Sequence, residues 1–288
     1  MERTKKIKVM NKKRAYIIEC SLKYTVFAIM LCVMLFPFLF MILKSLTSFE
    51  EINLKPVIFA PSYISFEAFG AFVPYLKYFK NSFIVVLINA IVVPFTSCMV
   101  AYPLARYKFK GSGFMFGLIL ATSMIPSSVV QVPQYKLFTD FGLYDTLASQ
   151  YIGAFFGGTG MQIFLIIQFM RAIPRELDEA ATIDGANVYM IFIMIMMPLC
   201  FNIYIYTSVG VAMAQWANFQ GPLIYIKTDE IRPIAAAFYH HFGASSNAAI
   251  EGNIKMAVAL CITIFPAILF FFFQKQMIGG VKLGAVKG

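Results

Sequence analysis

The sequence predicts an all-α membrane protein with six transmembrane helices, and three observations support this fold class. Of its 288 residues, 60% are hydrophobic and only 13% are charged, and the mean hydropathy is +0.74. Soluble domains average about 45–50% apolar and about 25% charged residues. Apolar runs long enough for membrane helices also recur along the chain, and Lys and Arg gather in alternate connecting segments. A soluble enzyme is therefore excluded.

The six predicted spans cover residues 24–43, 83–103, 114–135, 147–170, 188–213 and 256–274. Each is long enough to cross about 30 Å of hydrocarbon. The first is too long for the apolar region of a signal peptide, and no small-x-small cleavage pattern follows it. We therefore expect an uncleaved helix. Pro126 and Pro133 predict a kink in the third span, while Pro198 and Gly210 offer places for the fifth to bend.

The distribution of charge predicts the orientation. With the N-terminus inside, the entire net charge of +10 falls on the inside segments and the outside segments are neutral. Both termini are thus expected in the cytoplasm. Residues 1–23 form a basic N-terminus that sets topology and touches anionic lipid, in preference to nucleic acid. Residues 24–288 form the six-helix domain, with Ser45–Asn81 and Gly221–Lys255 as long external segments.

Several kinds of membrane function are disfavoured by what the sequence lacks. The six spans contain no Asp, Glu, Lys, Arg or His, one of which an ion-coupled carrier usually needs at membrane depth. His240 and His241 are adjacent and are expected to be a solvated loop pair. Neither GxSxG nor HExxH occurs, so no catalytic residue and no metal site is predicted. No Walker A sequence occurs either, so ATP, if used, must bind to another subunit.

The stretch ELDEAATIDGA, Glu176–Ala186, concentrates four acids between two apolar segments. Pro174 suits the first position of a helix, and acids early in a helix are favoured by its dipole. Gly185 is placed to end the helix in a left-handed conformation. One face of this helix is narrow and made of small residues: Leu177, Ala180, Ala181 and Asp184. Such a helix either lies in a groove of a partner or connects two spans along the membrane surface.

A resemblance to a known family favours the groove of a partner over the membrane surface. EAATIDGANVYMIFIMIMMPL, Glu179–Leu199, resembles the EAA loop of binding-protein-dependent ABC importer permeases. AYPLARYKFKG (Ala101–Gly111) and MIPSSVVQVPQY (Met124–Tyr135) are similar to segments of the carbohydrate branch, specifically the maltose-type second permease subunit. QWANFQGPLIYI (Gln215–Ile226) is similar as well, so the resemblance extends over nearly the whole chain beyond the basic N-terminus.

The resemblance implies a type I ABC importer permease fold in the bacterial cell membrane. Its coupling helix, in a loop of about residues 171–187, would dock into an ATPase. The docking positions it implies are Glu179, Ala180, Ala181, Asp184 and Gly185. The implied partners are a second permease subunit, expected as a heterodimer, two cytoplasmic ATPase subunits and an external solute-binding protein. ATP and Mg would be held by the ATPase, and this chain would bind no cofactor and no nucleic acid.

The expected cargo is a carbohydrate. Sugars are bound by side-chain amides, hydroxyls and aromatic faces. The candidates in the spans are Gln131, Gln162, Asn202, Tyr206 and Gln215. Each of these is also explained as a hydrogen-bonding residue between helices. Import of a non-sugar solute, or a stand-alone ion-coupled carrier, therefore remains open at this point.

Overall fold

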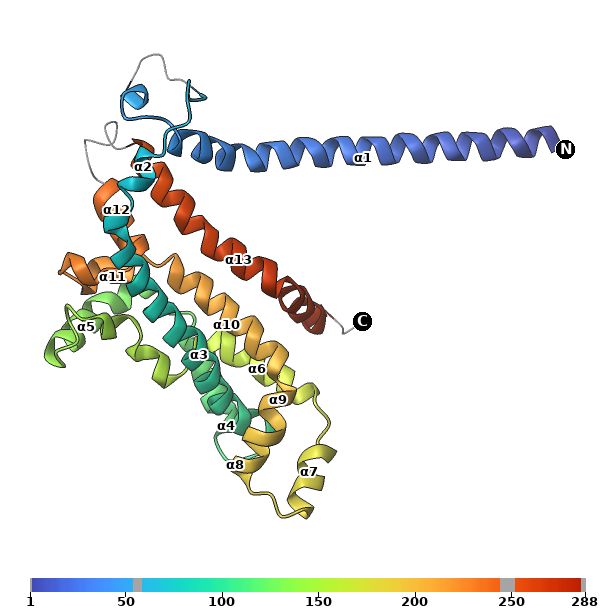
Figure 1. The fold of residues 1–288 in the computed structure, drawn as a ribbon. Coiled ribbons are helices and arrows are strands. Elements are labelled where there is room, and N and C mark those ends of the chain that lie inside the picture. The colour runs from blue at the N-terminus through green and yellow to red at the C-terminus, as the bar shows by residue number, and fades with distance from the viewer. Residues whose placement is uncertain (1, 54–58, 244–251, 286–288) are drawn as a thin grey trace. The chain divides into compact units, whose positions relative to one another are not determined.

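The computed structural model describes residues 2–53, 59–243 and 252–285, and every regular element among them is a helix (Figure 1). The chain divides into two compact units. One consists of Met1–Phe72 with Asn247–Leu260, and the other of Val73–Ser246 with Cys261–Gly288. The helix α13 (Gly252–Ala285) begins in the first unit and continues into the second.

The first unit is dominated by α1 (Glu2–Ser45), whose apolar part covers the first predicted span. Among the described residues, none of the most apolar stretch of α1 is buried. A buried hydrogen bond from Asn253 Nδ2 to the Thr47 carbonyl, 3.1 Å long, joins the segment after α1 to the start of α13. The short helices of this unit are η1 (Glu51–Asn53) and α2 (Glu67–Gly70).

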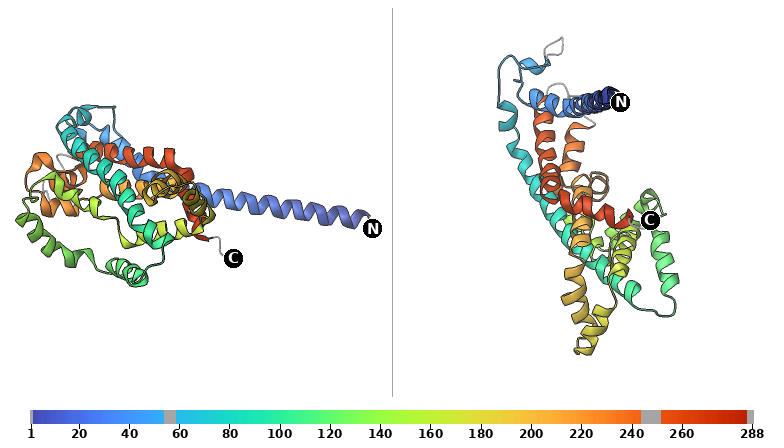
Figure 2. Two further views of the ribbon diagram at one scale, coloured as in Figure 1. Left: turned by 90° about the horizontal axis from the view of Figure 1, so that it is seen from below. Right: turned by 90° about the vertical axis from the view of Figure 1, so that its right-hand side faces the viewer.

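The second unit is built around α3 (Leu76–Arg106), which packs on α10 (Phe201–Trp216) and α6 (Gly160–Ala172). Figures 1 and 2 show α3 running beside α10. The other elements of the second unit are η2 (Val73–Tyr75), α4 (Ser112–Thr122), α5 (Ser127–Asp140), η3 (Leu147–Gln150), η4 (Ile152–Phe156), α7 (Glu176–Ile183), α8 (Val188–Met190), the π-helix η5 (Ile191–Met196), α9 (Met197–Leu199), α11 (Gln220–Tyr225), η6 (Asp229–Ile231) and α12 (Ile234–Phe242).

Two predicted spans are broken where the sequence offered a proline. α4 and α5 meet at 95°, and Pro126 stands immediately before α5. A proline disfavours the helical conformation of the residue before it, here Ile125, so α4 and α5 cannot continue as one helix. The fifth span bends by 74° between α9 and α10, just after Pro198. Gly210, the other residue suggested for this bend, lies inside α10.

Residues 147–170 do not form the continuous helix that the sequence predicted. They form η3 and η4, then a turn, and only then α6. Gly157 has a φ of +102°, a conformation that an L-residue in a helix cannot adopt. The side chain of Thr159 accepts a hydrogen bond from the Gln162 N–H and starts α6 anew as a capping box. With 13 residues, α6 is about 20 Å long, shorter than the hydrocarbon core.

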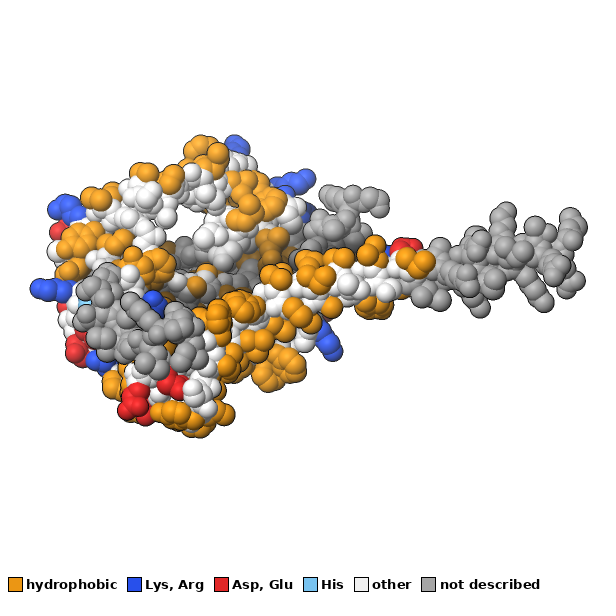
Figure 3. Space-filling model, turned by 90° about the horizontal axis from the view of Figure 1, so that it is seen from above, with side chains coloured by type: hydrophobic (Ala, Val, Ile, Leu, Met, Phe, Trp, Pro, Cys, Tyr) orange, Lys and Arg blue, Asp and Glu red, His pale blue; other side chains and the backbone are white. Residues whose placement is uncertain are grey.

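Three helices of the described chain are long and apolar enough to cross a membrane, or up to five if each bent pair is one span. Figure 3 shows apolar side chains over much of the visible face. Large apolar residues such as Phe36, Leu87 and Phe271 are more than half exposed, which suits a surface bathed in lipid. The main core lies where α3, α6, η5 and the start of α10 meet, around the fully buried Ile166 and Met196.

Candidate functional site

The acidic segment forms the short helix α7, whose two ends differ in how well the sequence predicted them. Arg175 is the N-cap and Pro174 precedes it, so the prediction that Pro174 is the first helical residue is wrong. The end is as expected, because Gly185 has a φ of +84°. The Gly185 N–H bonds to Thr182, and the Ala186 N–H bonds to Ala181. This paired closure is a Schellman motif, which requires a left-handed residue.

Four of the five predicted docking residues are exposed, and one is not. Glu179, Ala180, Asp184 and Gly185 face solvent, whereas Ala181 is buried in the main core of this same chain. The small side chain of Ala181 thus lets α7 lie close to its own helical unit. The exposed side of α7 carries Ala180 as its small residue.

A buried arginine also holds α7 to the bundle. Arg106, the last residue of α3, has a side chain only 3% exposed, and its Nε lies 3.0 Å from Asp178 Oδ2. Its Nη1 donates a 2.8 Å hydrogen bond to the Ile173 carbonyl just before α7, and its Nη2 contacts Met196 Sδ on η5. A buried guanidinium is stable only when it is paired in this way. Arg106 therefore links α3, α7 and η5 at one point.

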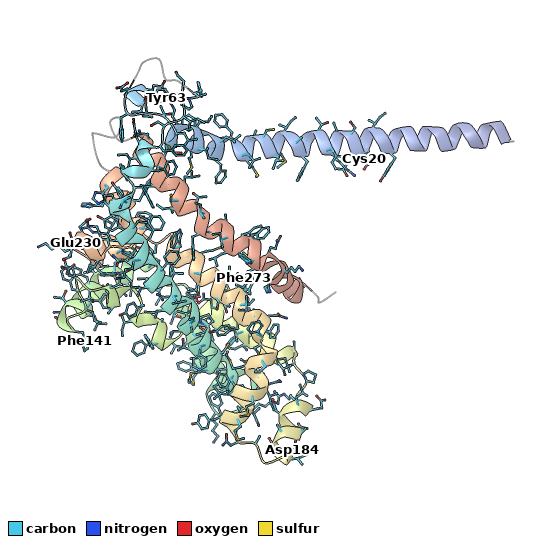
Figure 4. All side chains as sticks on the ribbon, viewed as in Figure 1. Cys20, Tyr63, Phe141, Asp184, Glu230 and Phe273 are labelled. Carbon is cyan, nitrogen blue, oxygen red and sulfur yellow. The ribbon has the colours of Figure 1, made fainter. Side chains whose placement is uncertain are left out.

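α7 lies at one end of its unit. Figure 4 places Asp184, at the end of α7, and Glu230, between α11 and α12, at opposite ends of the same unit. The sequence assigned these two segments to opposite sides of the membrane.

The second candidate site is a cavity of about 520 Å³ in the second unit, a size typical of small-molecule pockets. Its lining is rich in side-chain amides, and none of the described residues that line it is charged. The amide residues, which come from α3, α5, η3, α6, α10 and the α10–α11 turn, are Asn89, Gln131, Gln134, Gln150, Gln162, Gln215 and Asn218. Tyr225 adds an aromatic ring, and its hydroxyl donates to Gln134 Oε1 at 3.1 Å. Such a lining can hydrogen-bond a neutral polar molecule.

The structure brings together three of the five predicted substrate-path residues. Gln131, Gln162 and Gln215 line the amide cavity, while Asn202 and Tyr206 lie elsewhere on α10. The sequence reading missed Asn89 and the other amides, because neither residue type nor spacing marks them as neighbours. The Oε1 of Gln215 is buried with no hydrogen-bond partner among the described residues.

Glycines form one wall of this cavity, where the backbone lies close to neighbouring helices. The Gly158 N–H donates to Ser97 Oγ on α3 at 2.9 Å, and a Cβ at Gly158 would lie 2.5 Å from that oxygen. A Cβ at Gly160 would collide with the Ile119 carbonyl of α4. Only glycine permits these contacts, so the turn that interrupts the predicted fourth span also shapes the cavity.

The two histidines do not lie in a loop, as was predicted, although His240 is exposed. They lie on α12, and His241 Nε2 is 3.4 Å from Asp229 Oδ1. Asp229 also accepts from the Tyr78 hydroxyl and pairs with Arg232 at 3.1 Å. Desolvation alone would raise the pKa of Asp229, but the Tyr78 hydrogen bond and the nearby positive groups outweigh it, so this pKa lies below its usual value.

A metal ion is disfavoured at this cluster. Ligand atoms of Asp229, His240 and His241 lie within 4.8 Å of one another. However, Lys77 and Arg232 already occupy the Asp229 carboxylate, and their charges repel a cation. Burial, followed by the nearby Arg232 charge, lowers the pKa of His240. The cluster therefore has a structural role: its hydrogen bonds and ion pairs hold α3, η6 and α12 together.

A second group of hydrogen bonds between segments is centred on Asp145, which has a φ of +58°. Its carboxylate accepts from the Lys227 N–H, the Thr228 N–H and the Thr228 hydroxyl, all at 2.7–2.8 Å. Its own N–H donates to the Tyr225 carbonyl at 2.9 Å. The hydrogen bonds from Thr228 are the main reason that the pKa of Asp145 is lowered. They tie the turn after α5 to the segment after α11.

Comparison with known proteins agrees with this architecture. Residues 94–282 match the family described as binding-protein-dependent transport system inner membrane component. The chain is 30% identical over 272 residues to the arabinooligosaccharides transport system permease protein AraQ of Halalkalibacterium halodurans, covering 91% of this chain and 94% of that protein. It is 29% identical to the melibiose/raffinose/stachyose import permease protein MelC of Bacillus subtilis, covering 91% and 94%.

A solved structure shares the fold. It is a chain of a bacterial ABC transporter involved in the import of the acidic polysaccharide alginate, with a TM-score of 0.80 at 19% identity, covering 90% of this chain and 96% of that one. The family match covers more than half of the sequence, and the similarity to the curated permeases extends over nearly all of it. The chain is thus a membrane-embedded transport protein and belongs to the binding-protein-dependent transport system inner membrane component family.

Proposed function

We propose that this chain is the permease subunit of an ATP-driven importer and that it translocates an uncharged oligosaccharide through the amide cavity. The observation that carries the proposal is the lining of that cavity, which combines seven amide side chains with no charged residue among those described. Amides donate and accept hydrogen bonds and so match the hydroxyls of sugars. The relatives named above for neutral oligosaccharides support this class of cargo.

The lining argues for a neutral cargo over an acidic one. A buried carboxylate is costly unless a cation or several donors pair with it. The structural neighbour belongs to a transporter involved in the import of an acidic polysaccharide, but the described lining here holds no Lys, Arg or His for carboxylates. A neutral sugar meets its requirements with amides and the Tyr225 ring alone.

The motion that drives transport would pass from the ATPase to the cavity through α7. The exposed side of this helix, with Glu179 and Ala180, is the proposed contact for an ATPase subunit, which would bind ATP and Mg. Because Arg106 and the buried Ala181 hold α7 to the unit, a push on α7 moves the bundle with it. The working assembly would then contain a second permease, two ATPases and an external binding protein. Residues 1–23 and the coupling segment 171–187 would face the cytoplasm.

The experiment measures uptake in cells that produce the whole importer. Labelled arabino-oligosaccharide, raffinose and alginate oligosaccharide are compared for the native chain, for Gln131→Leu with Gln215→Leu, and for Gln168→Leu. Gln168 lies exposed on α6 outside the cavity and is the matched control. We expect uptake of a neutral sugar, and a drop of about tenfold or more in the double variant, since each lost hydrogen bond contributes about 1 kcal/mol.

Three results would count against the proposal. Preferential uptake of the acidic oligosaccharide would exclude a neutral cargo. Equal losses in Gln168→Leu would show that the effect is not specific to the cavity. Uptake by the purified chain alone in vesicles, without an ATPase, would instead support a stand-alone carrier.

A further inference from the structure

A basic pocket of about 360 Å³, separate from the amide cavity, lies where α3 and α6 end and α4 begins. We call it the basic pocket, and its lining residues are Leu104, Ala105, Tyr107, Lys108, Ser112, Arg171 and Arg175. Three of the seven residues are cationic and none is acidic. Neither the coupling helix nor the cargo cavity accounts for this concentration of positive charge.

The cations of the basic pocket have no acidic partner within the described part of the chain. Among the described residues, no carboxylate lies within ion-pair distance of Lys108, Arg171 or Arg175. Asp178, the partly buried acid of α7, pairs with Arg106 instead. Three cations around one pocket repel each other unless an anion sits between them.

One of the cations, Arg171, is exposed but is oriented by two contacts within the chain. The Arg171 Nη2 donates to the Leu104 carbonyl at 3.3 Å, and the guanidinium lies 5.8 Å from the centre of the Phe116 ring. A guanidinium held on a carbonyl and a ring is pre-organised, so it loses little freedom when it binds an anion. Lys108 and Arg175 are exposed and can adjust to the ligand.

The surroundings favour an anion that is part of a lipid. The basic pocket sits at the ends of apolar helices, and the neighbouring Phe114 and Leu118 of α4 are 77% and 57% exposed. Exposed apolar side chains beside a basic pocket fit a molecule that has both acyl chains and an anionic headgroup. Basic pockets between membrane helices on the cytoplasmic side bind such headgroups. The charge pattern of the sequence places this end of the unit inside.

We propose that the basic pocket binds the phosphate of an anionic phospholipid headgroup. Arg171 and the adjustable Lys108 and Arg175 would pair with its oxygens, and Ser112 would donate from its hydroxyl. Because Arg175 is also the N-cap residue of α7, a bound headgroup lies directly at the start of the coupling helix. The lipid would thereby stabilise the position of α7.

The test uses the full-length chain, purified with the subunits that accompany it in detergent and then delipidated. Native mass spectrometry measures binding of phosphatidylglycerol and phosphatidylcholine with the same acyl chains. The test variant is K108Q with R175Q. The matched control is K80Q with K136Q, which removes two exposed charges on segments that the charge pattern places on the other side of the membrane.

We expect the native chain to prefer phosphatidylglycerol. Near a membrane each Lys or Arg contributes about 1 kcal/mol to anionic-lipid binding, so K108Q with R175Q should lose about 30-fold in affinity. The control should stay within about twofold of the native chain, because its charges lie more than a Debye length from the basic pocket. If the double variant does not elute as a folded protein, the two single variants replace it, each with an expected loss of about fivefold.

Three outcomes would overturn the proposal. One is equal loss of phosphatidylglycerol in the test and control variants. Another is saturation of the basic pocket by inorganic phosphate with the affinity of the lipid, which would make the ligand a soluble anion. The third is loss of a copurifying ATPase from K108Q with R175Q at unchanged lipid affinity, which would make the basic pocket part of a protein interface.

Discussion

The Nε of Arg106 at the end of α3 lies 3.0 Å from the Asp178 carboxylate on α7, and this ion pair links α7 to α3. Removing one member leaves the other charge without its partner. The Arg106 side chain is almost fully buried, while that of Asp178 is 21% exposed.

We expect Asp178→Asn to destabilise the chain by about 2 kcal/mol, because it leaves a buried guanidinium uncompensated. Glu176→Gln, which neutralises an exposed acid on the same helix, should change little. Thermal unfolding of both variants, and of Arg106→Gln alone and combined with Asp178→Asn, measures the coupling. Strictly additive losses in the double variant would show that the pair does not act together.

Gly185→Leu should leave the chain in the membrane and abolish uptake. A Cβ at this position meets nothing within 4 Å, so the cost comes from the backbone φ of +84°. A left-handed conformation costs a side chain about 1–2 kcal/mol. Gly185→Asn is the matched control, because Asn tolerates this conformation. Uptake by Gly185→Leu at the native level, with normal expression, would remove α7 from the coupling role.

Cysteine substitution should distinguish the two alanines of α7. In a background without native cysteines, Ala180→Cys should react with a maleimide added from the cytoplasmic side and cross-link to the ATPase. Ala181→Cys should do neither, because position 181 is buried in this chain's core. Labelling of Ala180→Cys only from the outside would reverse the predicted orientation, and equal labelling at both positions would contradict the packing of α7.

Gly160→Val should destabilise the contact between α4 and α6. A Cβ there collides with the Ile119 carbonyl and lies 2.5 Å from Ser123 Oγ. Overpacking of this kind costs about 1–3 kcal/mol. Gly117→Val on α4 is the control, because a Cβ at that glycine meets nothing within 4 Å. Melting temperatures in detergent report the difference, and equal losses in both variants would mean that α4 and α6 are not closely packed.

Acid should weaken the hydrogen bonds that the Asp145 carboxylate accepts from Lys227 and Thr228. The folded-state pKa of Asp145 is depressed, so its contribution to stability is fully present above its ordinary value, near pH 4, and falls as the pH drops through the folded pKa. Hydrogen exchange at the Lys227 and Thr228 amides should therefore accelerate below about pH 4, beyond the intrinsic change of rate.

Asp145→Asn controls for the charge at Asp145. It keeps an acceptor and tolerates the left-handed φ, so it should show weaker protection that does not vary with acid. A native pH profile in Asp145→Asn would assign the acid response to another group.

Local chemistry made part of this structure predictable. Long apolar runs predicted α1, α3 and α13. Pro126 and Pro198 lie beside the breaks of two further spans, because a proline has no N–H to continue the hydrogen bonds of a helix. Gly185 was recognised because only a few residues end a helix in a left-handed conformation.

Features that depend on tertiary contacts were not predictable. Gly157 reads as an ordinary small residue in an apolar run, yet its backbone breaks the fourth predicted span. Ala181 shares its sequence pattern with Ala180, and only the packing of α7 decides which one is buried. The partnership of Arg106 with Asp178 joins distant segments, and no local signal records it.

The position of Arg106 on α3 has a mechanical consequence. Asn89 of the same helix lines the amide cavity and lies 17 positions before Arg106, which corresponds to about 25 Å of helix. Pivoted at its Arg106 end, a rod of that length swings its Asn89 end sideways by about 4 Å for a tilt of roughly 10°. α3 is in effect a lever arm, and a small rotation imposed at the coupling end suffices to displace one wall of the cavity by more than the radius of a water molecule.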